Sequence, residues 1–233
     1  MSIDVAFILT ALKEILNAIP LTLVITFIPL IIGVLIAIVV TFIRLGAHQV
    51  LQAIANFYVS FFRGTPVVLH IFLIYFGLPI LSKSWFNISL DGWPIVTFVI
   101  IALSLNAGAF LSEILRSGIL SVSKDQIEAA TSLGMTTLQL FKRIILPQAF
   151  VTIIPNLTNM IIGFLHASSI AFLVSVKEIT GTANIVASSN LKYLEAFIAL
   201  GMIYWFISIV FEWIGTVIEK KLTAHLRQGV VLK

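Results

Sequence analysis

Residues 128–147 read EAATSLGMTTLQLFKRIILP, and this stretch decides the fold. Seven of its letters follow the spaced pattern E-A-A-x3-G-x9-I-x-L-P. Gly134 divides the stretch, because a glycine at the end of a helix allows a backbone turn that a side chain would hinder. Thr136 can then cap a following helix through its hydroxyl group. The stretch therefore predicts a helix over 126–133, a turn at Gly134 and a second helix over 137–145.

Long uncharged runs lie on both sides of this stretch. The 233 residues are 60% hydrophobic and only 10% charged, with a mean hydropathy of +1.13, whereas about 25% of the residues in a soluble domain are charged. A membrane-spanning helix needs about 20 apolar residues to cross roughly 30 Å of hydrocarbon. The long apolar runs predict five such helices, near 20–43, 64–82, 92–112, 149–172 and 193–217, and the last carries Glu212 close to its end. We therefore expect an all-α integral membrane protein with about five transmembrane helices.

The basic residues predict how the chain is oriented. An odd number of spans puts the termini on opposite sides, and Lys and Arg concentrate in cytoplasmic segments. If the N-terminus is outside, ten of the 14 basic residues are cytoplasmic and the other four, Lys13, Lys83, Lys177 and Lys192, are outside. We therefore expect an outside N-terminus, a cytoplasmic C-terminus and a cytoplasmic loop over 113–147, the longest connection in the chain.

The two ends complete a single transmembrane domain over 1–233. Residues 1–19 place apolar side chains at helical spacing, with charged residues among them, which predicts an amphipathic helix on the bilayer surface. The alternative is that they begin the first span. No basic segment with a following cleavage site indicates a secretory signal. Residues 218–233 are expected to form a cytoplasmic tail.

Several classes of function lack their usual motifs. The chain has no cysteine, which excludes disulfides and thiolate metal sites, and it has no cluster that predicts a metal site. The basic residues are scattered, so no basic face predicts nucleic-acid binding. No phosphate-binding loop of the form G-x-x-x-x-G-K-[ST] is present, nor is H-E-x-x-H or G-x-S-x-G. The chain is therefore not predicted to be an enzyme.

The loop pattern resembles the signature of permease subunits of ATP-binding-cassette importers. The resemblance covers roughly residues 20–222. Within the family, the chain is most similar to the polar amino-acid uptake branch. Further stretches that carry it are FRGTP at 62–66, YFGLP at 75–79, GAFLSEILRSGI at 108–119, QIEAA at 126–130 and LPQA at 146–149. Two positions depart from the branch. Asp125 precedes Gln126 where a glycine is usual, and HASSI at 166–170 replaces the common KDTSL.

The resemblance implies a fold, a cellular location and partners. It implies the type I importer permease fold in the inner membrane of a bacterium. A second permease copy or a paralogue, ATPase subunits that bind ATP and Mg, and an extracytoplasmic substrate-binding protein would complete the machine. The coupling loop would lie in a groove of the ATPase, with the motif residues Glu128, Ala129, Ala130, Gly134 and Pro147. The implied substrate is a polar or sulfur-containing amino acid, such as cystine, glutamine or a basic amino acid. The absence of a fixed acidic pair in the path disfavours a strongly cationic one and favours cystine or another zwitterion.

Polar residues at membrane depth are candidates for the substrate path, because such side chains normally face protein or a water-filled route. The candidates are Asn106, Asn159, His166, Ser168 and Ser169. Asn159 and His166 share a helix face with Gly163. The alternative is that these side chains tie helices together. We favour that alternative for His70.

Three charged residues lie near the predicted cytoplasmic boundary. Glu113 and Arg116 are three residues apart on a helix and can pair. Together with Arg63, they are expected to have a gating or structural role.

The competing interpretation is a secondary amino-acid carrier driven by an ion gradient. Such carriers commonly contain internal repeats, and we find no convincing repeat in this chain. A carrier also has no need of the E-A-A-x3-G pattern. A channel subunit is disfavoured because no acidic ring or glycine-rich filter sequence is present.

Overall fold

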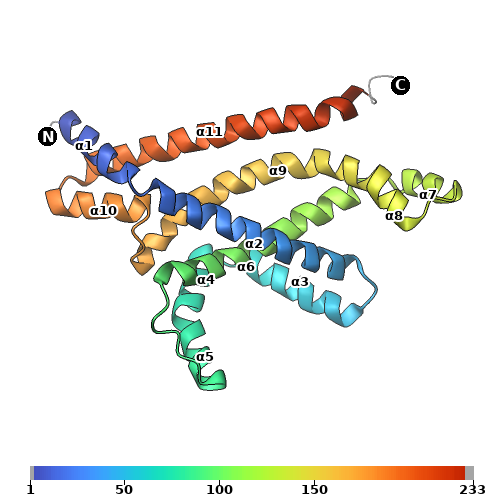
Figure 1. The fold of residues 1–233 in the computed structure, drawn as a ribbon, viewed down its shortest axis with the longest axis horizontal. Helices are drawn as coiled ribbons and strands as arrows, with labels where there is room; N and C mark the ends of the chain where they lie inside the picture. The colour runs from blue at the N-terminus through green and yellow to red at the C-terminus, as the bar shows by residue number, and fades with distance from the viewer. Residues whose placement is uncertain (1–2, 229–233) are drawn as a thin grey trace.

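The computed structural model describes the backbone of residues 3–228 and the side chains of residues 3–221. The described part of the chain is helical and contains no strand (Figure 1). Five helical stretches are long and apolar enough to cross a membrane: Ile19–Leu45, Val67–Phe86, Ile95–Leu120, Thr137–Val174 and Tyr193–Lys221. This confirms the predicted fold class. Residues 229–233 of the predicted tail lie outside the described residues.

Helices α2 (Ile19–Leu45) and α6 (Ile95–Leu120) form the centre of the bundle. Small residues bring their backbones close together. A Cβ atom added at Gly33 would lie 2.5 Å from the Cβ of Ala107, and one added at Gly108 would lie 2.5 Å from the side chain of Ile36. Close approach through small residues is how membrane helices pack when lipid replaces water as the solvent. Helix α9 (Leu146–Ala167) packs on α6, and α11 (Tyr193–Gln228) packs on α9.

Helix α3 (Gln49–Gly64) was not predicted. It packs along α2 and α6, where the Tyr58 hydroxyl donates to the carbonyl of Leu105 over 2.5 Å. The predicted start of the second span at residue 64 is wrong, because Gly64 is the last residue of α3 and the apolar stretch begins at Val67. The search for uncharged runs could not find α3, because this helix is more polar than the spans and ends where the uncharged run begins.

A π turn precedes each of two Leu-Pro pairs. Helix α4 (Val67–Phe72) continues through the π turn η1 (Leu73–Gly77) into α5 (Leu78–Phe86), which projects away from the bundle (Figure 1). In the same way, α8 (Thr137–Leu140) continues through η2 (Phe141–Ile145) into α9. A proline ring clashes with the carbonyl four residues earlier, and the wider π turn is one way to accommodate it.

The helix that begins after Thr136 is therefore longer than predicted. We expected it to end at residue 145 beside Pro147. Instead, helical structure runs from Thr137 to Val174, ending in the 3-10 helix η3 (Ser168–Val174). The predicted fourth span over 149–172 lies within this stretch.

The N-terminal helix α1 (Val5–Leu16) is separate from the first span, because the chain turns at Asn17 before α2 begins. Its buried side chains, Ala11 and Ile15, face α11 and α10 (Ile179–Asn190). The Asp4 side chain caps α1 and forms a 2.6 Å ion pair with Lys192, the residue just before α11. Helix α1 is therefore held against the last span by both apolar and charged contacts.

Candidate functional site

The coupling loop has the predicted helix–glycine–helix form. Helix α7 (Lys124–Ser132) is followed by a turn at Gly134, whose φ of +78° lies in the left-handed region. The N–H groups of Gly134 and Met135 donate to the carbonyls of Thr131 and Ala130 over 2.9 and 3.2 Å, which satisfies the end of the helix. Thr136 then caps α8 in a reciprocal capping box with Gln139. The loop therefore has a fixed shape that follows from its own residues.

The motif residues of this loop differ in their exposure to solvent. Ala130 is buried, whereas Glu128, Ala129 and Gly134 are exposed. Pro147 is half-buried in the first turn of α9. The loop also exposes two large apolar side chains, since Leu133 is 82% exposed and Leu138 is 62% exposed.

Gln148 fixes α7 against the membrane part of the chain. Its Nε2 donates to Gln126 Oε1 over 2.6 Å and to the carbonyl of Ile144 over 3.2 Å. A displacement of α7 is thereby linked to the start of α9, which continues into the bundle.

The three predicted charged residues lie in one cluster, together with a fourth residue that we did not predict. Glu113 accepts from Arg116 and from Arg44, each over 2.6 Å, and Arg63 lies 3.7 Å away. Arg44 also donates to Asn56 over 2.8 Å. The cluster thus joins the ends of α2 and α3 to α6, which favours a structural role. The predicted Glu113–Arg116 pair is confirmed.

Asn106 closes the end of α3. It is only 6% exposed, and its Nδ2 donates to the Phe62 carbonyl over 3.2 Å and lies 3.1 Å from His70 Nδ1. Thr65 Oγ1 donates to the Phe61 carbonyl and lies 2.7 Å from His70 Nε2. Because carbonyls at a helix end within a membrane need internal donors, these side chains stabilise the break between α3 and α4. The preferred interpretation of His70, as a link to a neighbouring helix, is confirmed.

One face of α9 carries the other polar candidates. Asn156, Asn159, Gly163 and His166 are all exposed, at spacings of three, four and three residues. His166 Nε2 lies 3.1 Å from Ser208 Oγ of α11, and its ring packs edge-on against Tyr204. The Asn156 amide donates to the carbonyl of Thr152 over 2.7 Å. The face therefore offers amide and imidazole groups that can hydrogen-bond a carboxylate or an ammonium group.

The two serines do not join this face equally. Ser168 is fully buried, and its hydroxyl donates to the Leu165 carbonyl. Ser169 is less buried, but its hydroxyl donates to the His166 carbonyl over 2.7 Å. Within one chain, Asn159, His166 and Ser169 thus lie on one continuous stretch of helix, whereas Asn106 belongs to a separate buried network.

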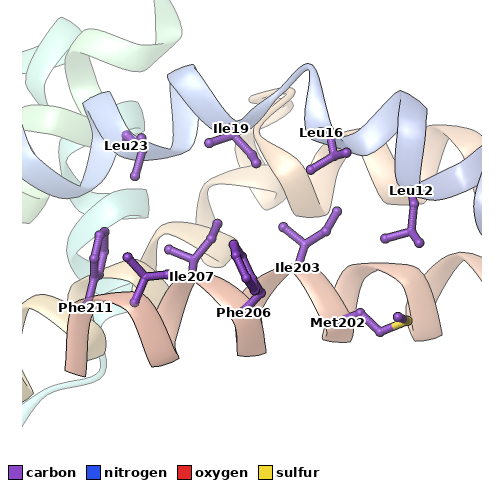
Figure 2. Close-up of a pocket in the computed structure, with 10 residues that line it drawn as sticks. Leu12, Leu16, Ile19, Leu23, Met202, Ile203, Phe206, Ile207 and Phe211 are labelled. Atoms are coloured by element: carbon purple, nitrogen blue, oxygen red, sulfur yellow. The ribbon is translucent and has the colours of Figure 1, made fainter. Parts of the chain in front are cut away.

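A groove of about 490 Å³ lies between α11 and the junction of α1 with α2. Figure 2 shows its walls, in which the side chains of Leu16, Ile19, Ile203 and Phe206 converge from the two sides. All the lining side chains are aliphatic, aromatic or thioether groups. No wall offers a partner for a carboxylate or an ammonium group, so this groove does not suit an amino acid.

Comparison with known proteins identifies the family. Residues 30–224 match the model of the binding-protein-dependent transport system inner membrane component. The chain belongs to this family. The permease is also similar to two Bacillus subtilis (strain 168) proteins. It is 35% identical to the L-cystine transport system permease protein TcyL, over 87% of this chain and 84% of the relative. It is 34% identical to the arginine transport system permease protein ArtQ, over 97% of this chain and all of the relative.

A solved structure agrees with these relatives. The permease matches a crystal structure of an amino acid ABC transporter with histidines, with a TM-score of 0.84 and 29% identity over 95% of this chain and all of the other. The permease therefore has the type I importer fold and is a permease subunit of an amino-acid ABC transporter in the inner membrane.

Four residues that bond across helices could not be predicted from the sequence. Arg44, Asn56, Tyr204 and Ser208 have no neighbours in sequence that would reveal their partners. Arg44 is the first charge after the first span, and this was the one signal that could have linked it to Glu113. Among the described residues, no group of three or more His, Cys, Asp or Glu side chains could hold a metal ion.

Proposed function

We propose that the permease forms one half of an amino-acid import path and transmits ATP-driven closure of a separate ATPase to that path. The observation that carries this proposal is the coupling loop, in which Glu128 and Ala129 are exposed on α7 and Leu133 and Gly134 are exposed in the turn that follows it. Gln148 then links the loop to the start of α9. Closure of two ATPase subunits, powered by ATP with Mg, would draw two such loops together and bias a two-state path.

The path would follow the exposed face of α9. Asn159 and His166 lie along it, and the half-buried Ser169 follows in η3. Polar groups exposed on a membrane helix favour a protein or water neighbour over lipid. A second permease copy or a paralogue would supply the opposite wall. The buried Asn106 and Ser168 would support this wall from behind, and the Glu113 cluster with Arg63 and Arg116 would fix the ends of the helices.

The proposed orientation has the N-terminus outside and the C-terminus, including residues 218–233, in the cytoplasm. The distribution of basic residues supports it. An extracytoplasmic binding protein would then deliver substrate at the end opposite the coupling loop. The chain would act as a single transmembrane domain over 1–233.

The proposed substrate is a zwitterionic amino acid such as cystine. The imidazole and amide groups of the α9 face can hydrogen-bond both ends of a zwitterion, and HASSI at 166–170 lacks the Lys-Asp pair common in the branch. The similarity to TcyL is compatible with cystine, but the similarity to ArtQ is nearly equal. The proposal of a zwitterion therefore rests on the side chains of the α9 face, because the similarity to these two relatives does not separate cystine from arginine.

Purification of the tagged chain from its native membrane in mild detergent tests the coupling. We expect a stoichiometric ATPase that carries a phosphate-binding loop, and amino acids that stimulate its ATP hydrolysis when the binding protein is present. A permease that purifies alone, from membranes in which other complexes remain intact, would contradict the proposal. Uptake that survives ATP depletion would favour the ion-driven carrier instead.

A further inference from the structure

A second hollow, of about 490 Å³, lies between the π turn η1, the loop that follows α5 and the first turns of α6. Its size is within the range of small-molecule pockets. Unlike the groove of Figure 2, it combines aromatic side chains with a carboxylate. The residues that matter are Tyr75, Phe76, Leu90, Asp91, Trp93 and Phe98.

Four aromatic rings form the wall of the hollow. Tyr75 and Phe76 come from the π turn η1, with their ring centroids 4.8 Å apart. The ring of Phe98 on α6 is 5.9 Å from Tyr75 and 6.3 Å from Trp93. Phe98 is only 4% exposed and fixes the row, whereas Trp93 is 48% exposed and Phe76 is 60% exposed. The hollow is therefore lined by rings that remain accessible.

Asp91 places a negative charge beside these rings. Its carboxylate accepts from Ser89 Oγ over 2.7 Å, and no ion pair of Asp91 is found in the described part of the chain. Aromatic faces attract cations through their quadrupole, and an adjacent carboxylate adds direct attraction. The combination suits a small organic cation.

The position of the hollow connects it with transport. Helix α6 begins at the hollow and ends at the coupling loop, so the two features lie at opposite ends of one span. In the proposed orientation the hollow lies on the outer side, where substrate arrives.

We propose that this hollow binds the ammonium group of an amino acid before it enters the path. The inference rests on the proposed function for the identity of the ligand. Asp91 pairs with the ammonium group, and the exposed rings of Trp93 and Phe76 cover it.

The test uses Trp93 as its own reporter. The chain has four tryptophans, and replacing Trp85, Trp205 and Trp213 by Phe leaves Trp93 as the only one. The full-length chain is reconstituted in liposomes, and its emission is followed while tetramethylammonium chloride is added, with sodium chloride as the salt control. We expect a saturable change in emission.

Substitutions of the carboxylate decide whether charge is responsible. Asp91→Asn is expected to raise the half-saturating concentration about tenfold, and Asp91→Glu is expected to restore most of the binding. Asp125→Asn, which removes an exposed carboxylate from α7 at the other end of α6, is the matched control and is expected to change nothing. The absence of a saturable change, or equal binding in Asp91→Asn, would overturn the proposal.

Two further probes identify the group that is recognised. Glutamine is expected to compete with tetramethylammonium, whereas N-acetylglutamine, which lacks the ammonium group, is not. Equal competition by both, or competition by neither, would overturn the assignment to an amino-acid ammonium group. Because this readout needs no ATPase, failure of the coupling experiment and failure of this one are separate results.

Discussion

Gly134 adopts a left-handed backbone conformation in open space. Its φ is +78°, and a Cβ atom added there would meet nothing within 4 Å. The requirement for glycine is therefore one of backbone conformation, because no neighbour limits the size of a side chain. For most residues with a side chain, the left-handed region costs about 1–2 kcal/mol, while asparagine tolerates it well.

This distinction makes a prediction about two substitutions. Gly134→Asn is expected to retain most ATP-driven uptake, because asparagine can keep the turn. Gly134→Val is expected to lower uptake by about tenfold, because a β-branched residue disfavours this φ and the two helices of the loop lose their relative orientation. Uptake into proteoliposomes measures both variants, with membrane insertion checked for each. Normal uptake by the valine variant would show that the φ of Gly134 does not matter.

At the same scale, the coupling loop was predictable and the polar networks were not. Gly134 and Thr136 act on their immediate neighbours in sequence, so their roles could be predicted from local rules. The pairing of Glu113 with Arg116 was predictable for the same reason. The partners of Asn106, in contrast, are 36 and 44 residues away, and Glu113 is 69 residues from Arg44. Only the packing of the helices brings these residues together.

At the level of helices, the packing of α2 on α6 depends on the absence of side chains. Gly108 faces Ile36 and the Tyr58 hydroxyl, and an added Cβ atom would lie 2.5 and 2.7 Å from them. The same contact holds α3, because Tyr58 belongs to that helix. Any larger residue at this position must separate helices that share one core.

Gly108→Val is therefore expected to destabilise the bundle by about 1–3 kcal/mol or more, the range for overpacked cores. Gly201→Val on α11 is the matched control, since an added Cβ atom there meets nothing within 4 Å. Thermal unfolding of the two variants in the same detergent gives the comparison. Equal melting temperatures would mean that α2 and α6 can move apart without cost.

The attachment of α1 to α11 is expected to depend on pH. The hydrogen bond from Lys192, together with the N–H of Phe7, holds the pKa of Asp4 below its ordinary value of 3.8. Ionised Asp4 thus stabilises the attached helix above that value, and the contribution is lost as the pH falls through the lowered pKa. Amide hydrogen exchange of α1 should increase on acidification towards pH 3.

Asp4→Asn supplies the control for this effect. The variant is expected to exchange faster than the wild type at pH 6, and it should lack the part of the pH dependence that comes from Asp4. A wild-type helix whose protection is the same at pH 3 and pH 6, after correction for intrinsic exchange, would contradict the role of this pair.

The helices that were predicted well from the sequence are those that must be long and apolar to cross the membrane. The five spans were found because hydrocarbon demands long apolar runs. Helix α3 was missed because it contains Gln49, Gln52, Asn56 and Arg63, and its stability comes from α2 and α6. The continuation of α8 into α9 was also missed, since the π turn before Pro147 removes the usual reason for a helix to stop.

At the scale of the whole molecule, two parts of the described chain have little packed against them. Only 11% of the most apolar stretch within Val67–Phe86 is buried. Helix α5 projects away from the other helices (Figure 1). The polar face of α9 is open as well. Both features agree with a permease that pairs with a second copy or a paralogue.

The orientation of the whole molecule can be tested with a reagent that does not cross membranes. Because the chain lacks cysteine, Ser89→Cys and Ser132→Cys each introduce one thiol at an exposed position at opposite ends of α6. We expect a membrane-impermeant maleimide to label Ser89→Cys in spheroplasts and to label Ser132→Cys only after permeabilisation. The wild-type chain is the unlabelled control, and the reverse pattern would invert the proposed topology.

The open face of α9 also bears on how the cell keeps the subunits in balance. A newly inserted chain that has not yet paired presents Asn156, Asn159 and His166 to hydrocarbon, where polar side chains cost free energy. Exposed polar groups of this kind can distinguish an orphan subunit from an assembled one. We expect a chain synthesised without its partners to be degraded by membrane proteases, and Asn159→Leu combined with His166→Leu to lengthen its lifetime in a pulse-chase experiment. The residues that suit the path for substrate would then also limit how much unassembled permease accumulates.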